Sequence, residues 1–374
     1  MRKKLRWMPL ILLLAMLPIC VAAQESAAAN PDEVPAVQSK AAVVMDAATG
    51  RVLFAQQAHE RLPVASTTKI MTALLTLEQD GLDTYFTVDS AAIQVEGSSM
   101  GLRAGDSVSL RALAAGMLLA SGNDGANAAA VRIAGSQRAF AARMNQRAAE
   151  LGMKDTHFVT PSGLHDPLHY SSAYDMALLA REALQNPAFA ALCGQSKLVV
   201  QYGNPPYDRW LSNHNRLLRE YQGAIGVKTG FTKAAGRCLV SCAQREGVRL
   251  IIVTLGCPDD WNTHRRLFDW YFARLQLQTP ELPALALPVV GGQQRKVTLE
   301  AQALPQVALL AGETVTFNWE LPQFIYAPVK REQVVGWLAI RVDGQSIEEV
   351  ALAACEAVDA VEKQGFFSRL FRLA

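Results

Sequence analysis

Hydrophobic and polar positions divide the chain into segments with different periodicities. Residues 41–46 form an apolar run, residues 47–50 read Ala-Ala-Thr-Gly, and residues 51–55 form a second apolar run. This pattern predicts a β-hairpin around a turn marked by glycine. From about Ser66, apolar side chains recur at helical spacing, and residues 85–155 are rich in Ala and Leu with the same periodicity. The first part of the chain therefore predicts a strand pair followed by a helical block.

Three β-type runs follow the helical block, at residues 224–232, 237–244 and 249–256. Short turns between successive strands predict an antiparallel meander. A helix is predicted over residues 261–275, packed against these strands. We therefore expect an α+β fold, in which an antiparallel sheet is built from both ends of the segment and a helical block is inserted between them.

Pro and Gly positions indicate a domain boundary near residue 282. Residues 37–280 are expected to form the first domain, and short β-type runs in residues 284–360 predict a small all-β domain. Residues 351–361 are ambiguous, because their Ala content favours a helix and their neighbours favour a strand. Residues 24–36, rich in Ala, Pro and acidic side chains, are expected to be a linker.

The N-terminus has the pattern of an export signal. Basic residues precede an apolar run over residues 10–21, and Val21-Ala22-Ala23 provides small residues for cleavage. The apolar run is shorter than the roughly 20 residues of a membrane span, which is the alternative. A lipoprotein site at Cys20 is a weaker alternative, because the preceding Ile19 is bulky. Residues 1–23 are thus expected to be a signal peptide, and the mature protein is expected to be exported.

Composition excludes several classes of protein. The net charge is only +2 and 19% of residues are charged, which is unlike the basic surface of a nucleic-acid-binding protein. Beyond the signal, an odd number of scattered cysteines without a CxxC pair argues against a disulfide framework and a zinc ribbon. Those cysteines are Cys193, Cys238, Cys242, Cys257 and Cys355.

A cluster of histidines raises the alternative of a metal-dependent peptidase. His157, His165, Asp166 and His169 lie close together in the sequence. Pro167 interrupts any helix that would align His165 with His169, and no HExxH motif is present. A loop with hydrogen-bonded histidines is the favoured interpretation, and no metal or cofactor is expected.

Three short motifs carry the candidate chemistry, and the first is Ser66-Thr67-Thr68-Lys69. Lys69 lies one helical turn after Ser66, which brings its amine within reach of the hydroxyl. A serine becomes a good nucleophile only when a base takes its proton, and a lysine is such a base only when its pKa is depressed. Ser66 and Lys69 are therefore catalytic candidates. The alternative is a helix-capping serine followed by a solvated lysine.

The second motif is Ser121-Gly122-Asn123, in a predicted loop before a helix expected to start around Asn127. Ser121 is expected to relay a proton beside Lys69, and Asn123 to hydrogen-bond a substrate amide. The alternative is an ordinary turn between helices with a capping side chain.

The third motif, Lys228-Thr229-Gly230, lies on a predicted strand. Lys228 and Thr229 are expected to hold an anionic group such as a terminal carboxylate, and Gly230 permits close approach of another backbone. The N–H group of Phe231 is a candidate oxyanion donor together with that of Ser66. The alternative is a solvated lysine on a surface strand.

The order SxxK, SxN and KTG resembles the motif set of penicillin-binding proteins and class A β-lactamases. Longer stretches resemble the low-molecular-mass serine D-alanyl-D-alanine carboxypeptidases: residues 63–75, 118–136, 158–177 and 226–240. The similarity spans about residues 40–275, with a weaker likeness over 285–355 and the ending 365–371. It implies a penicillin-binding/β-lactamase-like domain followed by a small all-β domain.

This resemblance also implies substrates and residue roles. The enzyme would remove the terminal D-alanine from peptidoglycan stem peptides ending in D-Ala-D-Ala, at the outer face of the cytoplasmic membrane, in the cell wall or in the periplasm. β-Lactam antibiotics would be inhibitors that mimic this substrate. The implied catalytic residues are Ser66 as acyl-ester nucleophile, Lys69 as proton acceptor and Ser121 as proton relay. The implied substrate-binding residues are Asn123, Lys228, Thr229, Gly230 and Phe231.

Two alternatives of the same fold remain open. A class A-like β-lactamase needs a glutamate for deacylation, and Glu182 is the nearest candidate, but it lies within a helical pattern that begins near a capping Ser172. The middle motif also reads SGN instead of SDN. The other alternative is a non-hydrolytic protein that binds β-lactams or the cell wall.

The C-terminal residues 364–374 predict a short amphipathic helix. Phe366, Phe367, Leu370 and Phe371 would share one side, opposite basic residues. Such a helix suits an anionic membrane surface, whereas docking on the all-β domain is the alternative. The tail is therefore expected to associate peripherally with the membrane.

Overall fold

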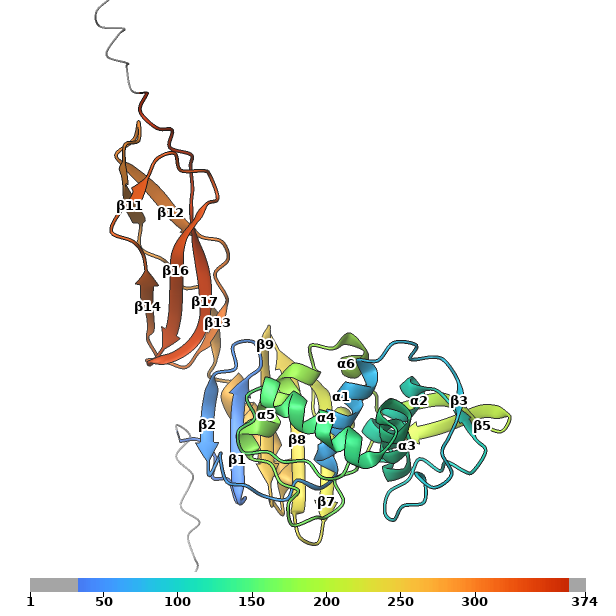
Figure 1. Ribbon diagram of the computed structural model, residues 1–374. Coiled ribbons are helices and arrows are strands. Elements are labelled where there is room, and N and C mark those ends of the chain that lie inside the picture. The colour runs from blue at the N-terminus through green and yellow to red at the C-terminus, as the bar shows by residue number, and fades with distance from the viewer. Residues whose placement is uncertain (1–32, 363–374) are drawn as a thin grey trace, which may run out of the picture. The chain divides into compact units, whose positions relative to one another are not determined.

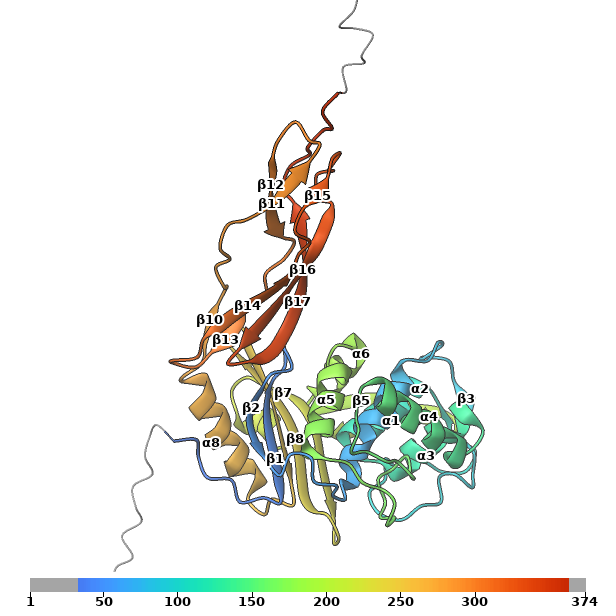
Figure 2. The same ribbon diagram turned by 60° about the vertical axis from the view of Figure 1, so that its left-hand side comes forward.

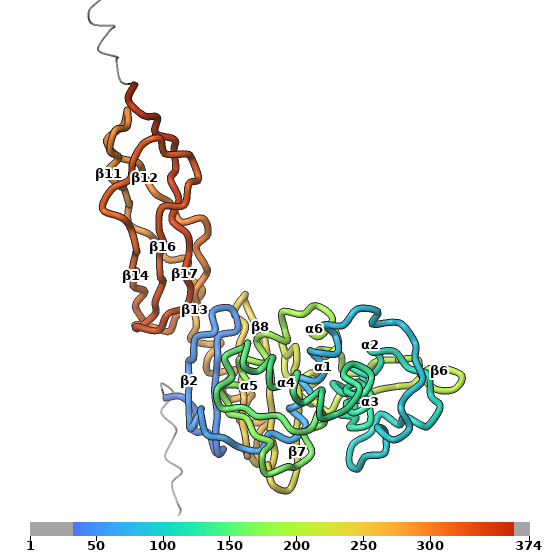
Figure 3. The backbone as a smooth tube through the Cα atoms, in the orientation of Figure 1, coloured from blue at the N-terminus to red at the C-terminus, as the bar shows by residue number. Residues whose placement is uncertain are grey.

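The computed structural model describes residues 33–362, and its central sheet combines strands from two distant parts of the chain. The order β2-β1-β9-β8-β7 is antiparallel throughout, and β1 is buried along its whole length. Figure 3 shows the blue N-terminal strands beside the yellow ones. The strands are β1 (Ala41–Asp46), β2 (Val52–Gln56), β7 (Ala224–Thr232), β8 (Gly236–Arg245) and β9 (Val248–Leu255). The predicted hairpin, meander and split sheet are confirmed.

Helices cover both faces of this sheet. Helix α5 (Ala173–Ala183) packs on β1 and β9, and α8 (Asp260–Phe272) packs on β8 and β9 from the other side (Figure 2). The remaining helices form the inserted block and its connections: η1 (Ala65–Thr68), α1 (Lys69–Leu77), α2 (Leu110–Leu119), α3 (Asn123–Ala134), α4 (Gln137–Glu150), α6 (Pro187–Cys193) and α7 (Leu217–Glu220). The side chain of Ser172 accepts a hydrogen bond from the N–H of Asp175, which confirms the predicted cap.

A four-stranded sheet that the sequence pattern did not indicate completes this part of the molecule. It consists of β3 (Phe86–Thr87), β4 (Ser107–Val108), β5 (Lys197–Gly203) and β6 (Pro206–Ser212), in that order. Two of these strands have only two residues, so no periodicity is visible in them.

The C-terminal part is all-β, as predicted (Figure 1). Six strands pair in the order β14-β16-β17-β12-β11-β15, and β10 pairs with β13. Their bounds are β10 (Gln276–Gln278), β11 (Leu285–Val290), β12 (Lys296–Ala301), β13 (Val307–Leu309), β14 (Val315–Glu320), β15 (Ile325–Tyr326), β16 (Val334–Val342) and β17 (Gln345–Ala354). Strand β17 includes the first ambiguous residues, 351–354, so pairing with β12 and β16 overrides their Ala content.

Two predicted helix starts are wrong by a few residues. The helix expected from Ser66 begins as the 3-10 turn η1 and becomes α-helical only at Lys69. The helix expected around Asn127 begins at Asn123, because Ser121 has a φ of 59° and turns the chain sharply just before it.

Several predictions concern residues outside the described part. These are the signal peptide (1–23), most of the linker (24–36) and the membrane-associating tail (364–374). None of the helices between residues 33 and 362 combines the length and apolar character that a membrane span requires.

Candidate active site

Ser66 lies in the tight turn η1, which two neighbouring segments hold in place. The preceding Ala65 has a φ of 47°, a conformation that costs free energy for a residue with a Cβ atom. Thr67 Oγ1 donates to the Val64 carbonyl at 2.6 Å, and Thr68 Oγ1 donates to the Ala65 carbonyl at 2.8 Å. These bonds satisfy two carbonyl groups of the turn. They hold Ser66, the candidate nucleophile, directly after the strained residue Ala65.

The edge strand β7 approaches this turn closely at Gly230. A Cβ atom at this position would lie 3.1 Å from the backbone nitrogens of Ser66 and Thr67. The backbone that approaches Gly230 is therefore the turn that carries Ser66. Gly230 brings the strand of the KTG motif against the serine, and no larger residue fits there without displacement.

Lys69 is buried beneath Ser66, and its Nζ atom has three hydrogen-bond partners. Nζ donates to Ser66 Oγ at 2.9 Å, to Asn123 Oδ1 at 2.7 Å and to the Ser162 carbonyl at 2.6 Å. Burial holds the pKa of Lys69 well below its usual value, and the nearby positive charge of Lys228 lowers the pKa further. In the neutral amine that this lowered pKa favours, two N–H groups serve Asn123 Oδ1 and the Ser162 carbonyl, and the lone pair can accept the proton of the Ser66 hydroxyl.

The SGN loop contacts both lysines. Lys228 Nζ donates to Ser121 Oγ at 3.1 Å, whereas Lys69 bonds to Asn123. The amide nitrogen of Asn123 donates to the Glu96 carbonyl at 2.7 Å. In this structure Ser121 is thus hydrogen-bonded to the second lysine, and the predicted roles of Ser121 and Asn123 toward a substrate stay predictions.

Lys228 is also buried, and burial lowers its pKa to about 7. Its Nζ donates to the Thr229 carbonyl at 2.9 Å as well as to Ser121. A cavity of about 280 Å³ opens beside these groups. Among the residues that line it are Ser66, Ser121, Thr229, Gly230 and Phe231. Tertiary structure has therefore gathered all three motifs around one cleft.

Sequence reasoning missed Asp124, which follows the SGN motif directly. Its buried carboxylate accepts hydrogen bonds from five groups, four of them in the loop 99–102: Ser99 Oγ and the N–H groups of Met100, Gly101, Leu102 and Gly125. Ser98, just before this loop, lines the cleft. The sequence gave no sign of this role, because four of the five groups that donate to Asp124 lie more than 20 residues away in the chain.

His169 was considered as a metal ligand, but in the structure it supports the η1 turn. Its Nδ1 accepts hydrogen bonds from the N–H groups of Val159 and Thr160, so the proton of the neutral ring is on Nε2. Nε2 then donates to Thr68 Oγ1 at 2.8 Å. Burial lowers its pKa to about 4. Within residues 33–362 no group of three side chains is arranged to hold a metal ion.

Glu182, the candidate of the β-lactamase alternative, is hydrogen-bonded to Arg147 at 2.7 Å on the helical block. It is absent from the lining of the cleft that holds Ser66. The structure thus gives Glu182 a partner outside the cleft.

A serine paired with a buried lysine of depressed pKa, in a cleft at the edge of an antiparallel sheet, defines a serine hydrolase. Comparison with known proteins agrees. Residues 25–259 match the family profile of the D-alanyl-D-alanine carboxypeptidases, peptidase family S11. The chain belongs to this family, which acts on D-Ala-D-Ala peptides of peptidoglycan and is typically acylated by β-lactams.

Relatives match over most of their length. The chain is 33% identical to D-alanyl-D-alanine carboxypeptidase DacF of Bacillus subtilis, covering 90% of this chain and 89% of the relative. It is 34% identical to D-alanyl-D-alanine carboxypeptidase DacC of Escherichia coli, and this match covers 92% of this chain and 90% of the relative. Among solved structures, penicillin binding protein 5 of Haemophilus influenzae matches with a TM-score of 0.72 and 28% identity, covering 87% of this chain and 98% of that one.

Proposed function

We propose that Ser66 carries the acyl-enzyme of a D-Ala-D-Ala carboxypeptidase reaction. Ser66 Oγ attacks the carbonyl carbon of the penultimate D-alanine, and the bond from that carbon to the nitrogen of the terminal D-alanine breaks. Lys69 takes the hydroxyl proton, which passes to the leaving amine, so D-alanine departs with a neutral amine. Water then hydrolyses the ester and releases the shortened peptide.

The observation that carries this proposal is the contact of Lys69 with Ser66. The 2.9 Å separation allows direct proton transfer, and burial of the amine lowers its pKa, which favours the neutral form that can accept a proton. Ser121 Oγ accepts a hydrogen bond from Lys228, so we assign proton delivery to the leaving amine to Ser121 together with Lys228.

Strand β7 supports the substrate-binding half of the proposal. It is the edge strand of the central sheet, so its free edge suits an extended peptide added as a further strand. Thr229, Gly230 and Phe231 line the cleft on this strand. We assign the N–H groups of Ser66 and Phe231 to the developing oxyanion, and Asn123 and Lys228 to substrate binding.

A single adduct experiment tests the assignment. Mass spectrometry of the protein incubated with benzylpenicillin should show one added drug molecule, and peptide mapping should place it on Ser66. Ser66→Ala should give no adduct and no release of D-alanine from a D-Ala-D-Ala peptide. An adduct on a different side chain would refute the proposed nucleophile.

We further propose that the protein is exported and that residues 364–374 hold it at a membrane surface. The apolar and basic residues of this tail, such as Phe367 and Arg369, support peripheral binding. Deleting 364–374 should reduce sedimentation with anionic vesicles and leave D-alanine release from soluble peptides unchanged. Unchanged sedimentation would contradict the anchoring role.

A further inference from the structure

The all-β part exposes a group of apolar side chains at one end. Val290 ends β11 and Tyr326 ends β15, and the two strands pair in parallel so that these residues are neighbours. The ring of Phe324 contacts the ring of Tyr326, with the ring centres 5.4 Å apart. The exposed fractions are 45% for Val290, 43% for Phe324 and 70% for Tyr326. We call these three residues the tip patch.

The hydrophobic core at this end does not include the tip patch. Side chains alternate between the two faces of a strand, so Val289 and Ile325 face away from the patch. Val289 and Val358 belong to the small buried cluster of this end, and Ile325 packs against that cluster. Single exposed apolar residues are ordinary, but a contiguous group of them marks a surface that contacts another body. The tip patch is therefore a candidate contact surface.

The described chain ends beside the tip patch. The N–H group of Val361 donates to the Gly291 carbonyl at 2.8 Å, and Gly291 directly follows Val290. Val361 is itself 57% exposed. Figure 2 shows β11, β12 and β15 together at this end of the all-β part. Two residues separate Val361 from residues 364–374, the segment proposed above to bind a membrane surface. The patch is thus tied by a very short connection to that segment.

The charged side chains around the patch balance one another. Arg295 and Lys296 follow the turn after β11, Asp359 and Glu362 lie in the last described segment, and all four are exposed. Electrostatic attraction to anionic lipids therefore adds little at this end, and any binding depends on apolar surface. A tyrosine beside other apolar side chains suits the boundary between lipid headgroups and acyl chains, because its ring is apolar and its hydroxyl is polar.

We infer that the tip patch inserts into a lipid surface beside the tail, so that Phe324 and Tyr326 form a second membrane contact on the folded protein. This inference rests on the proposed membrane association of residues 364–374, which brings the patch close to the surface. Stable membrane association usually needs two weak anchors, and two anchors on one molecule bind together more tightly than either alone. A patch on paired strands also fixes how the all-β part is oriented on the membrane.

Sedimentation with vesicles of phosphatidylcholine and phosphatidylglycerol tests the inference in the mature chain, tail included. The double variant Phe324→Ser with Tyr326→Ser should lower the partition coefficient about 10-fold, the effect expected when two partly inserted aromatic side chains are removed. The same loss is expected on vesicles of phosphatidylcholine alone, because the contact is apolar. Acylation by benzylpenicillin and the melting temperature should not change, since both side chains are exposed and neither lines the cleft.

An exposed aromatic residue in another sheet provides the matched control. Trp210 on β6 is 75% exposed, so Trp210→Ser removes a large exposed ring far from the tip patch in the fold. Its partition coefficient should equal that of the wild type. An unchanged partition coefficient in the double variant, or an equal loss in Trp210→Ser, would overturn the inference.

A fluorescent label distinguishes lipid from other occupants of the patch. Tyr326→Cys in a Cys355→Ser background accepts an environment-sensitive dye at the patch, because the other cysteines of the described chain are buried. Its emission should shift to the blue when vesicles are added. A blue shift without vesicles that disappears on deletion of 364–374 would show that the tail covers the patch, and one that rises with protein concentration would show a second copy. Either result would overturn the lipid assignment.

The two membrane contacts fail independently. If deletion of 364–374 lowers vesicle binding and the double variant at Phe324 and Tyr326 does not, the tail anchor stands and the tip contact is wrong. If the double variant lowers binding and the deletion does not, the tip contact stands and the proposed anchor is wrong.

Discussion

At the scale of single residues, burial gives two lysines unusual chemistry. Lys69 and Lys228 are withdrawn from solvent in one site, and burial lowers both pKa values. Each amine nevertheless has hydrogen-bond acceptors, so neither is left as an unpaired buried charge. This environment favours the neutral form of Lys69, which is the form that the proposed base requires.

The proposed base role of Lys69 predicts a large effect of Lys69→Arg on acylation. Arginine keeps the positive charge, but its pKa is too high for it to take the proton from Ser66. Acylation by benzylpenicillin should fall about 100- to 10,000-fold, the usual contribution of general base catalysis, as measured by stopped-flow or adduct mass spectrometry. Acylation close to the wild-type rate would exclude Lys69 as the base.

Two glycines separate the effect of backbone conformation from the effect of close packing. Gly163 and Gly152 both have positive φ, 79° and 72°, but a Cβ atom at Gly163 would lie 2.0 Å from the Ala65 carbonyl oxygen, whereas Gly152 has open space. Gly152→Ala should cost about 1 kcal/mol of unfolding free energy. Gly163→Ala should cost at least about 1 kcal/mol more and also slow acylation, because it displaces the turn that carries Ser66. Equal denaturation midpoints and acylation rates in the two variants would contradict this.

At the scale of elements, the central sheet was predictable and the path of the chain around the nucleophile was not. The strands 224–232 and 249–256 were visible as apolar runs between short turns, and β7 and β9 match them within one residue. The 3-10 form of η1 was not visible, because it depends on contacts of Ala65 and Thr68 with distant residues. Local propensity gives no information on such contacts.

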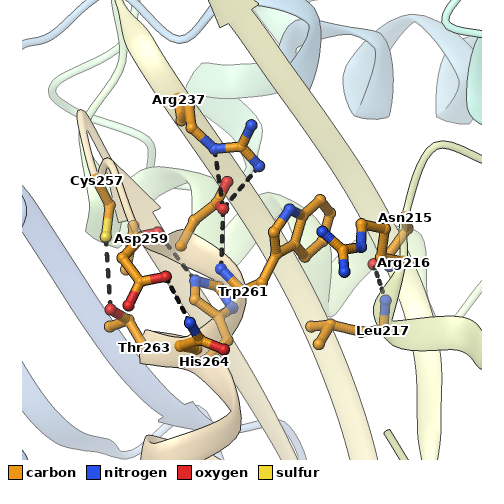
Figure 4. A network of polar contacts seen from close by, with 12 residues as sticks. Asn215, Arg216, Leu217, Arg237, Cys257, Asp259, Trp261, Thr263 and His264 are labelled. Atoms are coloured by element: carbon orange, nitrogen blue, oxygen red, sulfur yellow. Dashed lines mark hydrogen bonds and ion pairs between the residues drawn. The ribbon is translucent and has the colours of Figure 1, made fainter. Parts of the chain in front are cut away.

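Helix α8 is joined to the sheet by a fully buried histidine near the start of the helix (Figure 4). His264 Nδ1 lies 2.5 Å from Ser241 Oγ on β8, and Nε2 lies 2.9 Å from Thr254 Oγ1 on β9. Burial lowers its pKa to about 3, so the imidazole stays neutral in the folded protein.

Because His264 is buried in its neutral form, we expect the folded protein to lose stability in acid. Between about pH 6.5 and pH 3 the unfolded chain binds a proton at His264 and the folded protein does not, so the free energy of unfolding falls as the pH falls. The slope from one such group is up to about 1.4 kcal/mol per pH unit. In urea titrations, His264→Gln should show a shallower slope than the wild type over this window.

The exposed His165 is the control for this measurement. His165→Gln makes the same replacement where no buried contact is lost, so it measures the general effect of exchanging a histidine for a glutamine. The same slope in His264→Gln and the wild type would show that another group controls acid stability.

At the scale of the described chain, residues 33–362, the first part and the all-β part each contain hydrophobic clusters of their own. One large cluster spans residues from Ala41 to Leu255, and two small clusters lie within residues 282–358. The residues that line the catalytic cleft all fall between Ser66 and Trp261. Within residues 33–362, the all-β part therefore contributes no side chain to that cleft.

This separation predicts that a truncated chain keeps its chemistry. A protein ending at residue 280 should be acylated by benzylpenicillin within about threefold of the full-length rate, because the cleft is complete. Its melting temperature should fall, because β10 loses its partner strand β13 and side chains that they bury become exposed. A folded fragment with acylation slowed more than tenfold would show that the all-β part supports catalysis.

The sequence by itself determined the strands of the split sheet, the all-β character of the C-terminal part and the three motifs, since these depend on periodicity and short-range spacing. Only tertiary structure decided that Asn123 contacts Lys69 while Ser121 contacts Lys228, and that Val361 bonds to Gly291 beside the tip patch. Those contacts join residues far apart in the chain. Their geometry depends on how sheet and helices pack, and no local pattern encodes that packing.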